Sequence, residues 1–253
     1  MKVANAHKRL LSVWGRVDAA HNQLILKNVA GTRVLDVGCG YGALTHFLQQ
    51  RGFDVVGVER DRKSVSAAHE LFPDANVRLA DADNLDFPDR HFDTVILKDT
   101  LHHVFEQDDT GGLLDEILRM LKVGGSLIVF DPNPQPLIRL CRKLVFHVDP
   151  ECTPNDVLGL LEGKGFRIKS IEYSELLALP LSGGYVGPQL FPNWPFLVKG
   201  LLLANDLLGR MIGAVGLGRF LLWRYNIHAV KTSQPPVPGA AGGRLSTRCS
   251  GRK

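Results

Sequence analysis

Short runs rich in Val, Ile and Leu alternate between residues 33 and 173 with segments whose apolar residues recur at helical spacing. The runs that predict strands occupy residues 33–37, 54–58, 76–79, 92–97, 126–130 and 166–173. The segments that predict helices between them lie at 42–51, 61–71, 113–121 and 153–163. This alternation predicts an α/β fold with a doubly wound, mostly parallel sheet that carries helices on both faces.

The rest of the chain departs from this alternation. Residues 1–30 have helical spacing, residues 175–223 combine Gly- and Pro-rich turns with two apolar helical patterns, and 225–230 predict one further strand. Residues 233–253 are basic and rich in Pro, Gly and Ser, which predicts disorder. We therefore divide the chain into an N-terminal helical cap, an α/β core, an apolar cap or lid insertion, the last core strand and a tail, at 1–30, 31–174, 175–223, 224–231 and 232–253.

The net charge of +4 comes from the end of the chain. Five of the 30 Lys and Arg residues lie in 231–253, which holds no Asp or Glu. The remaining residues carry 25 basic and 26 acidic side chains and are therefore close to neutral. A nucleic-acid-binding protein usually presents a basic face, so we expect no nucleic-acid partner.

The four cysteines show neither paired spacing nor the spacing of metal ligands. We therefore expect reduced thiols, no metal site and a cytoplasmic protein. Residues 1–26 lack the continuous apolar segment of a signal peptide. Charged residues interrupt the apolar stretch 195–223, which argues against a membrane-spanning helix.

The most specific motif is the segment VLDVGCGYG at residues 34–42, where a predicted strand runs into a helix. Glycine at every second position lets the backbone adopt positive φ angles and approach a ligand closely. In an open α/β sheet, ligands bind beyond the carboxyl ends of the strands. The loop is therefore expected to bind a cofactor.

Two cofactor classes fit such a loop. Gly38, Gly40 and Ala43 also satisfy a dinucleotide pattern, which leaves an NAD(P)-dependent oxidoreductase as an alternative. Asp36 disfavours that alternative, because a carboxylate before the loop would repel a pyrophosphate and would attract a cationic ligand. Glu59 ends the second predicted strand, where an acid can bind the hydroxyls of a ribose in either class.

Several motifs in chain order resemble those of class I S-adenosylmethionine-dependent methyltransferases, close to the group that includes ubiquinone and menaquinone methyltransferases. LDVGCGYG resembles their first motif, and Glu59 resembles the acid that ends their second strand. Further similarities are the turn ADA at 80–82, the passage LDFPDRHFD at 85–93, LHHV at 101–104 and LKVGG at 121–125. The resemblance covers residues 31–131.

The resemblance implies a Rossmann-like methyltransferase fold with seven strands, in which the last strand is antiparallel and lies beside the sixth. It implies S-adenosylmethionine as the cofactor and methylation as the activity. The cofactor-binding residues that it implies are Asp36, Gly38, Cys39, Gly40, Tyr41, Gly42, Glu59, Arg60, Asp81, Ala82, Leu97 and Lys98. A partner subunit that binds the cofactor without turnover stays open as an alternative.

Two histidines are candidate general bases. His102 and His103 follow the fourth predicted strand at the expected cleft, and histidine titrates near neutral pH. The alternative is that they only shape the helix after that strand. Lys98 departs from the family, which has a small residue there. We expect its ammonium to reach solvent, or else to meet an acid such as Asp99 or Asp131.

Residues 175–223 are rich in Leu, Phe, Trp and Gly. One interpretation is a cover over a small, apolar acceptor of quinone or other lipid-like type, with peripheral contact of 195–223 to the inner face of a membrane. The other is that these helices pack on the sheet or on a second subunit. The apolar face is expected to comprise Phe196, Leu197, Leu201, Leu202, Leu203, Leu207 and Leu208.

Overall fold

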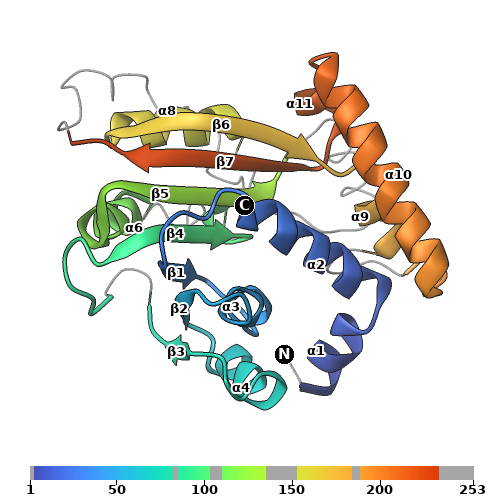
Figure 1. Cartoon of the computed structure of the whole chain (residues 1–253), viewed down its shortest axis with the longest axis horizontal. Coiled ribbons are helices and arrows are strands. Elements are labelled where there is room, and N and C mark those ends of the chain that lie inside the picture. Colours follow the sequence, from blue (N-terminus) through green and yellow to red (C-terminus); the bar gives the residue numbers. More distant parts are fainter. Residues whose placement is uncertain (1–2, 82–84, 103–109, 135–152, 184–188, 234–253) are drawn as a thin grey trace, which may run out of the picture.

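The computed structural model describes residues 3–81, 85–102, 110–134, 153–183 and 189–233. Within these ranges one sheet has the strand order β3-β2-β1-β4-β5-β7-β6 (Figure 1). β7 is antiparallel to both β5 and β6, and the other pairs are parallel. The predicted seven-stranded, doubly wound fold is confirmed. The strands are β1 Arg33–Val37, β2 Asp54–Glu59, β3 Val77–Leu79, β4 Phe92–Lys98, β5 Leu121–Pro132, β6 Phe166–Ser174 and β7 Arg224–Lys231.

Helices cover both faces of this sheet. One face packs Ile25 of α2 and Leu48 of α3 against Ile96 and Ile128, and the other packs helices α6 and α8 against Leu97 and neighbouring residues. The helices are α1 Val3–Leu10, α2 Val13–Leu26, α3 Ala43–Gln49, α4 Arg62–Leu71, α6 Thr110–Met120, α8 Pro154–Gly163, α9 Ala178–Ser182, α10 Pro195–Ala214 and α11 Gly218–Leu221. Burial on both faces explains why the strands read as uninterrupted apolar runs.

The described parts of the segment between β6 and β7 form helices α9, α10 and α11, and polar contacts within the segment hold them together. The Asn205 side-chain oxygen accepts hydrogen bonds from the backbone N–H groups of Leu176, Leu177 and Ala178, at 2.9 to 3.1 Å. The Trp223 indole N–H donates to the Leu176 carbonyl at 3.0 Å. Helices α9 to α11 lie on the side of the sheet toward which β4 and β6 point (Figure 1).

Helix α10 has two different apolar faces. Val198 and Leu201 pack inward against Val13, Trp14 and neighbouring residues of α2 and α9. The opposite face exposes Phe196, Leu203, Leu207 and Met211, each at 58% or more, so the predicted single apolar face was wrong. Helical periodicity explains the difference, because residues 201 and 203 point about 200° apart around the helix axis. No helix in the described ranges has the length and apolar character that a membrane crossing requires.

Candidate functional site

The glycine loop between β1 and α3 is held by the neighbouring strand. The backbone N–H groups of Gly38 and Cys39 donate to the Val58 carbonyl at 2.8 and 3.1 Å. Gly38 has a φ of +72°, and a β-carbon there would lie 2.4 Å from the Thr100 hydroxyl oxygen. Gly40 has a φ of +56° and would meet nothing within 4 Å. The loop is therefore packed at its base and open at its tip.

The carboxylate of Glu59 orders the loop tip. One of its oxygens accepts the Gly40 backbone N–H at 3.0 Å, and the other accepts the Asp61 N–H at 2.8 Å. Asp61 in turn caps α4 through hydrogen bonds from Lys63 and Ser64. The two candidate cofactor elements, the glycine loop and the acid at the end of β2, are thus one hydrogen-bonded unit.

Asp36 lies below the loop at 1% exposure and accepts a hydrogen bond from the Thr45 hydroxyl at 2.8 Å. Burial raises the pKa of this carboxyl group to about 6, although Thr45 and the positive charge of Lys98 act in the opposite direction. A carboxylate that is costly to ionise is stabilised by a nearby cation. Asp36 therefore favours a cationic ligand.

The other predicted cofactor residues differ in their surroundings. Burial raises the pKa values of the Cys39 thiol and the Tyr41 hydroxyl, so both stay neutral. The Leu97 side chain is fully buried in the core, which leaves only its backbone for a ligand. Arg60 and Asp81 are exposed beside the ends of β2 and β3. Ala82 lies outside the described residues.

The expectation that Lys98 reaches solvent was wrong. Its ammonium group donates to Asp18 at 2.7 Å and to Asn22 at 2.6 Å, and the side chain is only 10% exposed. The acid that meets it is therefore Asp18 of α2, and not Asp99 or Asp131. Helix α2 thus fixes the side chain of Lys98 at the end of β4.

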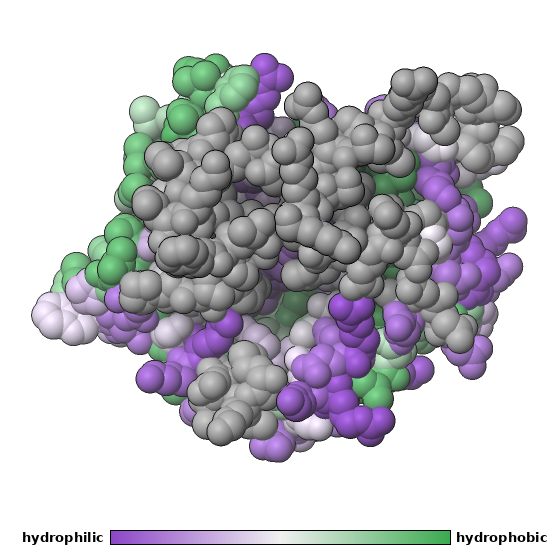
Figure 2. All heavy atoms as spheres, turned by 180° about the vertical axis from the view of Figure 1, so that it is seen from behind, coloured by the Kyte–Doolittle hydropathy of each residue, from purple (hydrophilic) through white to green (hydrophobic). Residues whose placement is uncertain are grey.

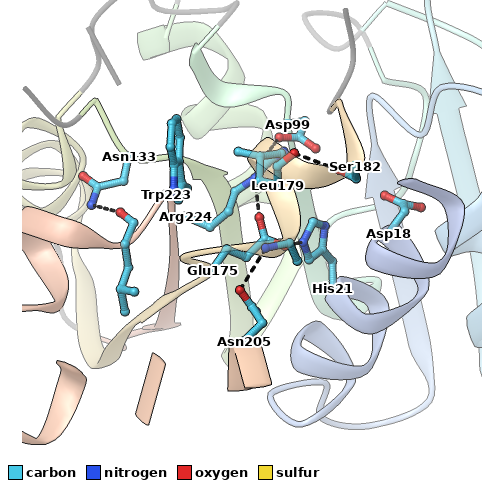
Figure 3. A network of polar contacts seen from close by, with 12 residues as sticks. Asp18, His21, Asp99, Asn133, Glu175, Leu179, Ser182, Asn205, Trp223 and Arg224 are labelled. Carbon is cyan, nitrogen blue, oxygen red and sulfur yellow. Dashed lines mark hydrogen bonds and ion pairs between the residues drawn. The ribbon is translucent and has the colours of Figure 1, made fainter. Parts of the chain in front are cut away.

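A chain of buried polar side chains continues from α2 toward β6 and β7. His21 of α2 contacts Glu175, which follows β6, and Arg224 of β7 lies on the other side of Glu175 with its Nε 4.0 Å from the carboxylate (Figure 3). Arg224 also pairs with Asp99, the residue after β4. Although burial alone would raise the pKa of Asp99, the charges of Arg224 and Lys98 lower it. Asp99 is therefore an anion.

His102 meets Asp131, the residue near the end of β5. The His102 backbone N–H donates to one carboxylate oxygen at 3.0 Å, and the ring Nδ1 lies 3.1 Å from the other. Asp131 is fully buried and the His102 side chain is 9% exposed. The structure thus places His102 at the ends of β4 and β5, and the second candidate, His103, lies outside the described residues.

Three polar residues of α2 were missed as site residues. Asp18, His21 and Asn22 are all buried, on the same helix face as Trp14 and Ile25. The sequence contained a pattern that could have identified them, because residues 18, 21, 22 and 25 recur at the spacing of one helix face. A polar group on the buried face of a helix needs a partner, but the sequence did not show which strand would provide it.

Comparison with known proteins points to one family. The family model of a methyltransferase domain matches residues 35–129, which run from β1 into β5 and contain the glycine loop. A 2-methyl-6-phytyl-1,4-hydroquinone methyltransferase of Synechocystis is 40% identical over 127 residues, 49% of this chain and 36% of that protein. A ubiquinone biosynthesis O-methyltransferase of Pseudomonas fluorescens is 34% identical over 115 residues, which are 43% and 48% of the two chains.

These matches span about half of the two curated relatives or less. A solved structure of a methyltransferase dependent on S-adenosylmethionine, from Archaeoglobus fulgidus, has the same fold, with a TM-score of 0.61 and 22% identity. The superposition covers 86% of this chain and 94% of that one. The comparisons do not favour the oxidoreductase alternative. They support the methyltransferase domain that the motifs predicted.

Proposed function

Because this chain belongs to the class I S-adenosylmethionine-dependent methyltransferases, we propose that it transfers a methyl group to a small, apolar or lipid-like acceptor. The observation that carries this proposal is that the Gly40 backbone N–H of the glycine loop donates to the Glu59 carboxylate, beside the buried carboxyl group of Asp36. The comparisons do not favour the alternatives, which are a hydride-transferring enzyme and a subunit without turnover.

The residues at the loop fit S-adenosylmethionine. Gly40 leaves open space where any side chain would project, and the backbone there can approach a ligand. Glu59 retains acceptor capacity on both oxygens for ribose hydroxyls, and Asp36 provides negative charge for the cationic part. Bound there, the cofactor would supply an electrophilic methyl group.

The protein's contribution to methyl transfer is mainly alignment and exclusion of water. A base is needed only when the nucleophile carries a proton at neutral pH. His102 is the described residue that suits this role, because it lies at the ends of β4 and β5 with Asp131 as its partner. Asp99 and Arg224 complete the polar surroundings.

The acceptor class is inferred from two sources. The two curated relatives are named for a phytyl hydroquinone and for ubiquinone biosynthesis, and both are ring compounds with isoprenoid tails. The segment between β6 and β7 in this chain is strongly apolar. We infer a hydroxylated ring with an apolar substituent as the acceptor.

We also propose peripheral contact with the cytoplasmic face of a membrane, and the exposed side of α10 and α11 supports this proposal. We name the exposed apolar residues there the α10 ridge: Phe196, Leu203, Leu207, Met211, Val215, Leu217, Phe220 and Leu221. Figure 2 shows this ridge along the left edge of the molecule. Residues 195–221 contain three basic residues and only one acidic residue, which suits an anionic bilayer surface.

Transfer of label from methyl-labelled S-adenosylmethionine to a hydroquinone with a short isoprenoid tail tests the proposed reaction. We expect labelled ether or ring-methyl product with the wild type and none with Glu59→Ala. No product from a panel of hydroquinones and catechols, despite intact cofactor binding, would contradict the proposed acceptor class.

Flotation with vesicles of phosphatidylcholine and phosphatidylglycerol tests the membrane contact. We expect the wild type to float with the vesicles and the double variant Leu203→Glu, Leu207→Glu to stay in the soluble fraction. Val123→Glu is a matched control, because Val123 is 50% exposed at the start of β5, outside the α10 ridge. A wild type that remains soluble would remove the membrane contact from the proposal.

A further inference from the structure

The carboxyl ends of β4 and β5 bring one carboxylate and one imidazole together. The two strands are parallel neighbours, with Lys98 opposite Phe130 at their last paired position. Asp131 comes one residue later on β5, and His102 follows the last residue of β4 by four positions. This edge of the sheet is where an open α/β fold binds its ligands.

Asp131 is oriented by both of its oxygens. One accepts the His102 backbone N–H at 3.0 Å, and the other lies 3.1 Å from Nδ1 of the same residue. Because Asp131 is fully buried, a bare carboxylate would be costly there, and each contact offsets part of that cost. The backbone contact fixes the carboxylate, and the carboxylate then fixes the ring.

We propose that Asp131 is a positioning residue that keeps the Nδ1 proton on His102, so that Nε2 holds the lone pair and acts as the general base. In a neutral imidazole one nitrogen donates and the other accepts, and the hydrogen bond at one nitrogen decides which tautomer forms. A carboxylate at Nδ1 can only accept, so it selects the tautomer with the proton at Nδ1.

This inference rests on the proposed methyl transfer to a hydroxylated acceptor. The hydroxyl proton moves to Nε2 while the oxygen gains the methyl group, and the electron pair of the broken carbon–sulfur bond stays on sulfur. The positive charge therefore passes from the sulfonium to His102. Asp131 stabilises that imidazolium directly, and Asp99, whose own partner is Arg224, contributes a second negative charge nearby.

The tautomer can be measured without an acceptor, by ¹⁵N nuclear magnetic resonance of histidine-labelled protein. His102→Gln assigns the resonances of this ring among the nine histidines. We expect Nδ1 protonated and Nε2 unprotonated in the wild type at pH 7.5 to 8. In Asp131→Asn the amide can donate to Nδ1, so we expect the proton to move to Nε2. Asp93→Asn is the matched control, because Asp93 is a hydrogen-bonded carboxylate at the other end of β4.

Turnover on a hydroquinone gives the second readout. We expect Asp131→Asn to lower kcat by roughly 100-fold, to shift the acidic limb of the kcat profile and to leave the affinity for S-adenosylmethionine unchanged. A wild-type His102 protonated at Nε2, or an unchanged kcat in Asp131→Asn, would overturn the inference. The wild-type spectrum alone shows which nitrogen of His102 is protonated, even if the Asp131→Asn variant fails to fold. An Nδ1-protonated His102 in a protein without turnover would instead count against the proposed function.

Discussion

At the scale of single residues, the ionisation of the buried Asp36 carboxyl group controls how strongly the loop binds a cationic ligand. Asp36 ionises reluctantly because it is buried, with a pKa of about 6, and a bound cation would favour its charged form. The carboxylate is therefore mostly ionised at neutral pH and mostly protonated at pH 5.

We predict that the affinity for S-adenosylmethionine falls as the pH is lowered through 6, by about tenfold for each pH unit below it. The sign follows from the protonated carboxyl, which no longer attracts the cationic ligand. Calorimetric titration between pH 5 and 8 measures this dependence. Asp36→Asn should bind weakly with no such pH dependence. An equal slope in the wild type and in Asp36→Asn would assign the titration to another group.

Alanine substitutions at two glycines of the loop should impair the protein in different ways. In Gly38→Ala the new methyl group would meet Thr100 at a positive φ, so we predict a loss of stability of about 2 kcal/mol or more. In Gly40→Ala the methyl group enters open space, so the loss of stability should be smaller while cofactor binding is still impaired. Thermal melts and titrations of both variants separate the two effects. Equal destabilisation by both would contradict this account of the loop.

At the scale of elements, most strands and helices were predictable because their patterns are local. The helix predicted at 153–163 is confirmed as α8, which Thr153 caps and which begins at Pro154. The partners of Lys98 were not predictable, since Asp18 lies 80 residues away along the chain. Likewise, Arg224, Glu175 and His21 come together only because β6, β7 and α2 converge. Sequence therefore indicated the cofactor loop but not the polar cluster beside it.

The turn that enters α9 depends on one side chain. Asn205→Ala would remove the acceptor of three backbone N–H groups, and we predict a loss of about 1–3 kcal/mol of unfolding free energy. Asn205→Asp keeps the acceptor oxygen and should stay closer to the wild type. The neighbouring Asp206→Ala removes only an exposed ion pair with Arg210, worth less than about 1 kcal/mol. Chemical denaturation of the three variants tests this order, and a larger loss in Asp206→Ala would contradict it.

At the scale of the whole molecule, the contacts of α10 with α2 and β6 attach the segment between β6 and β7 to the core. We predict that this segment and the sheet unfold in one transition. The three tryptophans lie in α2 or in residues 194–223, so their fluorescence follows the cap side, while far-ultraviolet circular dichroism follows the whole fold. Coincident midpoints are expected. A separate, earlier fluorescence transition would mean that the cap is an independent unit.

The central claim is that the glycine loop, Glu59 and Asp36 form a site for S-adenosylmethionine. Parallel calorimetric titrations of the purified protein with S-adenosylmethionine, S-adenosylhomocysteine and NADH test it most directly. We predict saturable binding of the first two and none of NADH, with binding of both weakened in Asp36→Ala while the fold is retained. Binding of NADH alone, or an unchanged affinity in Asp36→Ala, would contradict the claim.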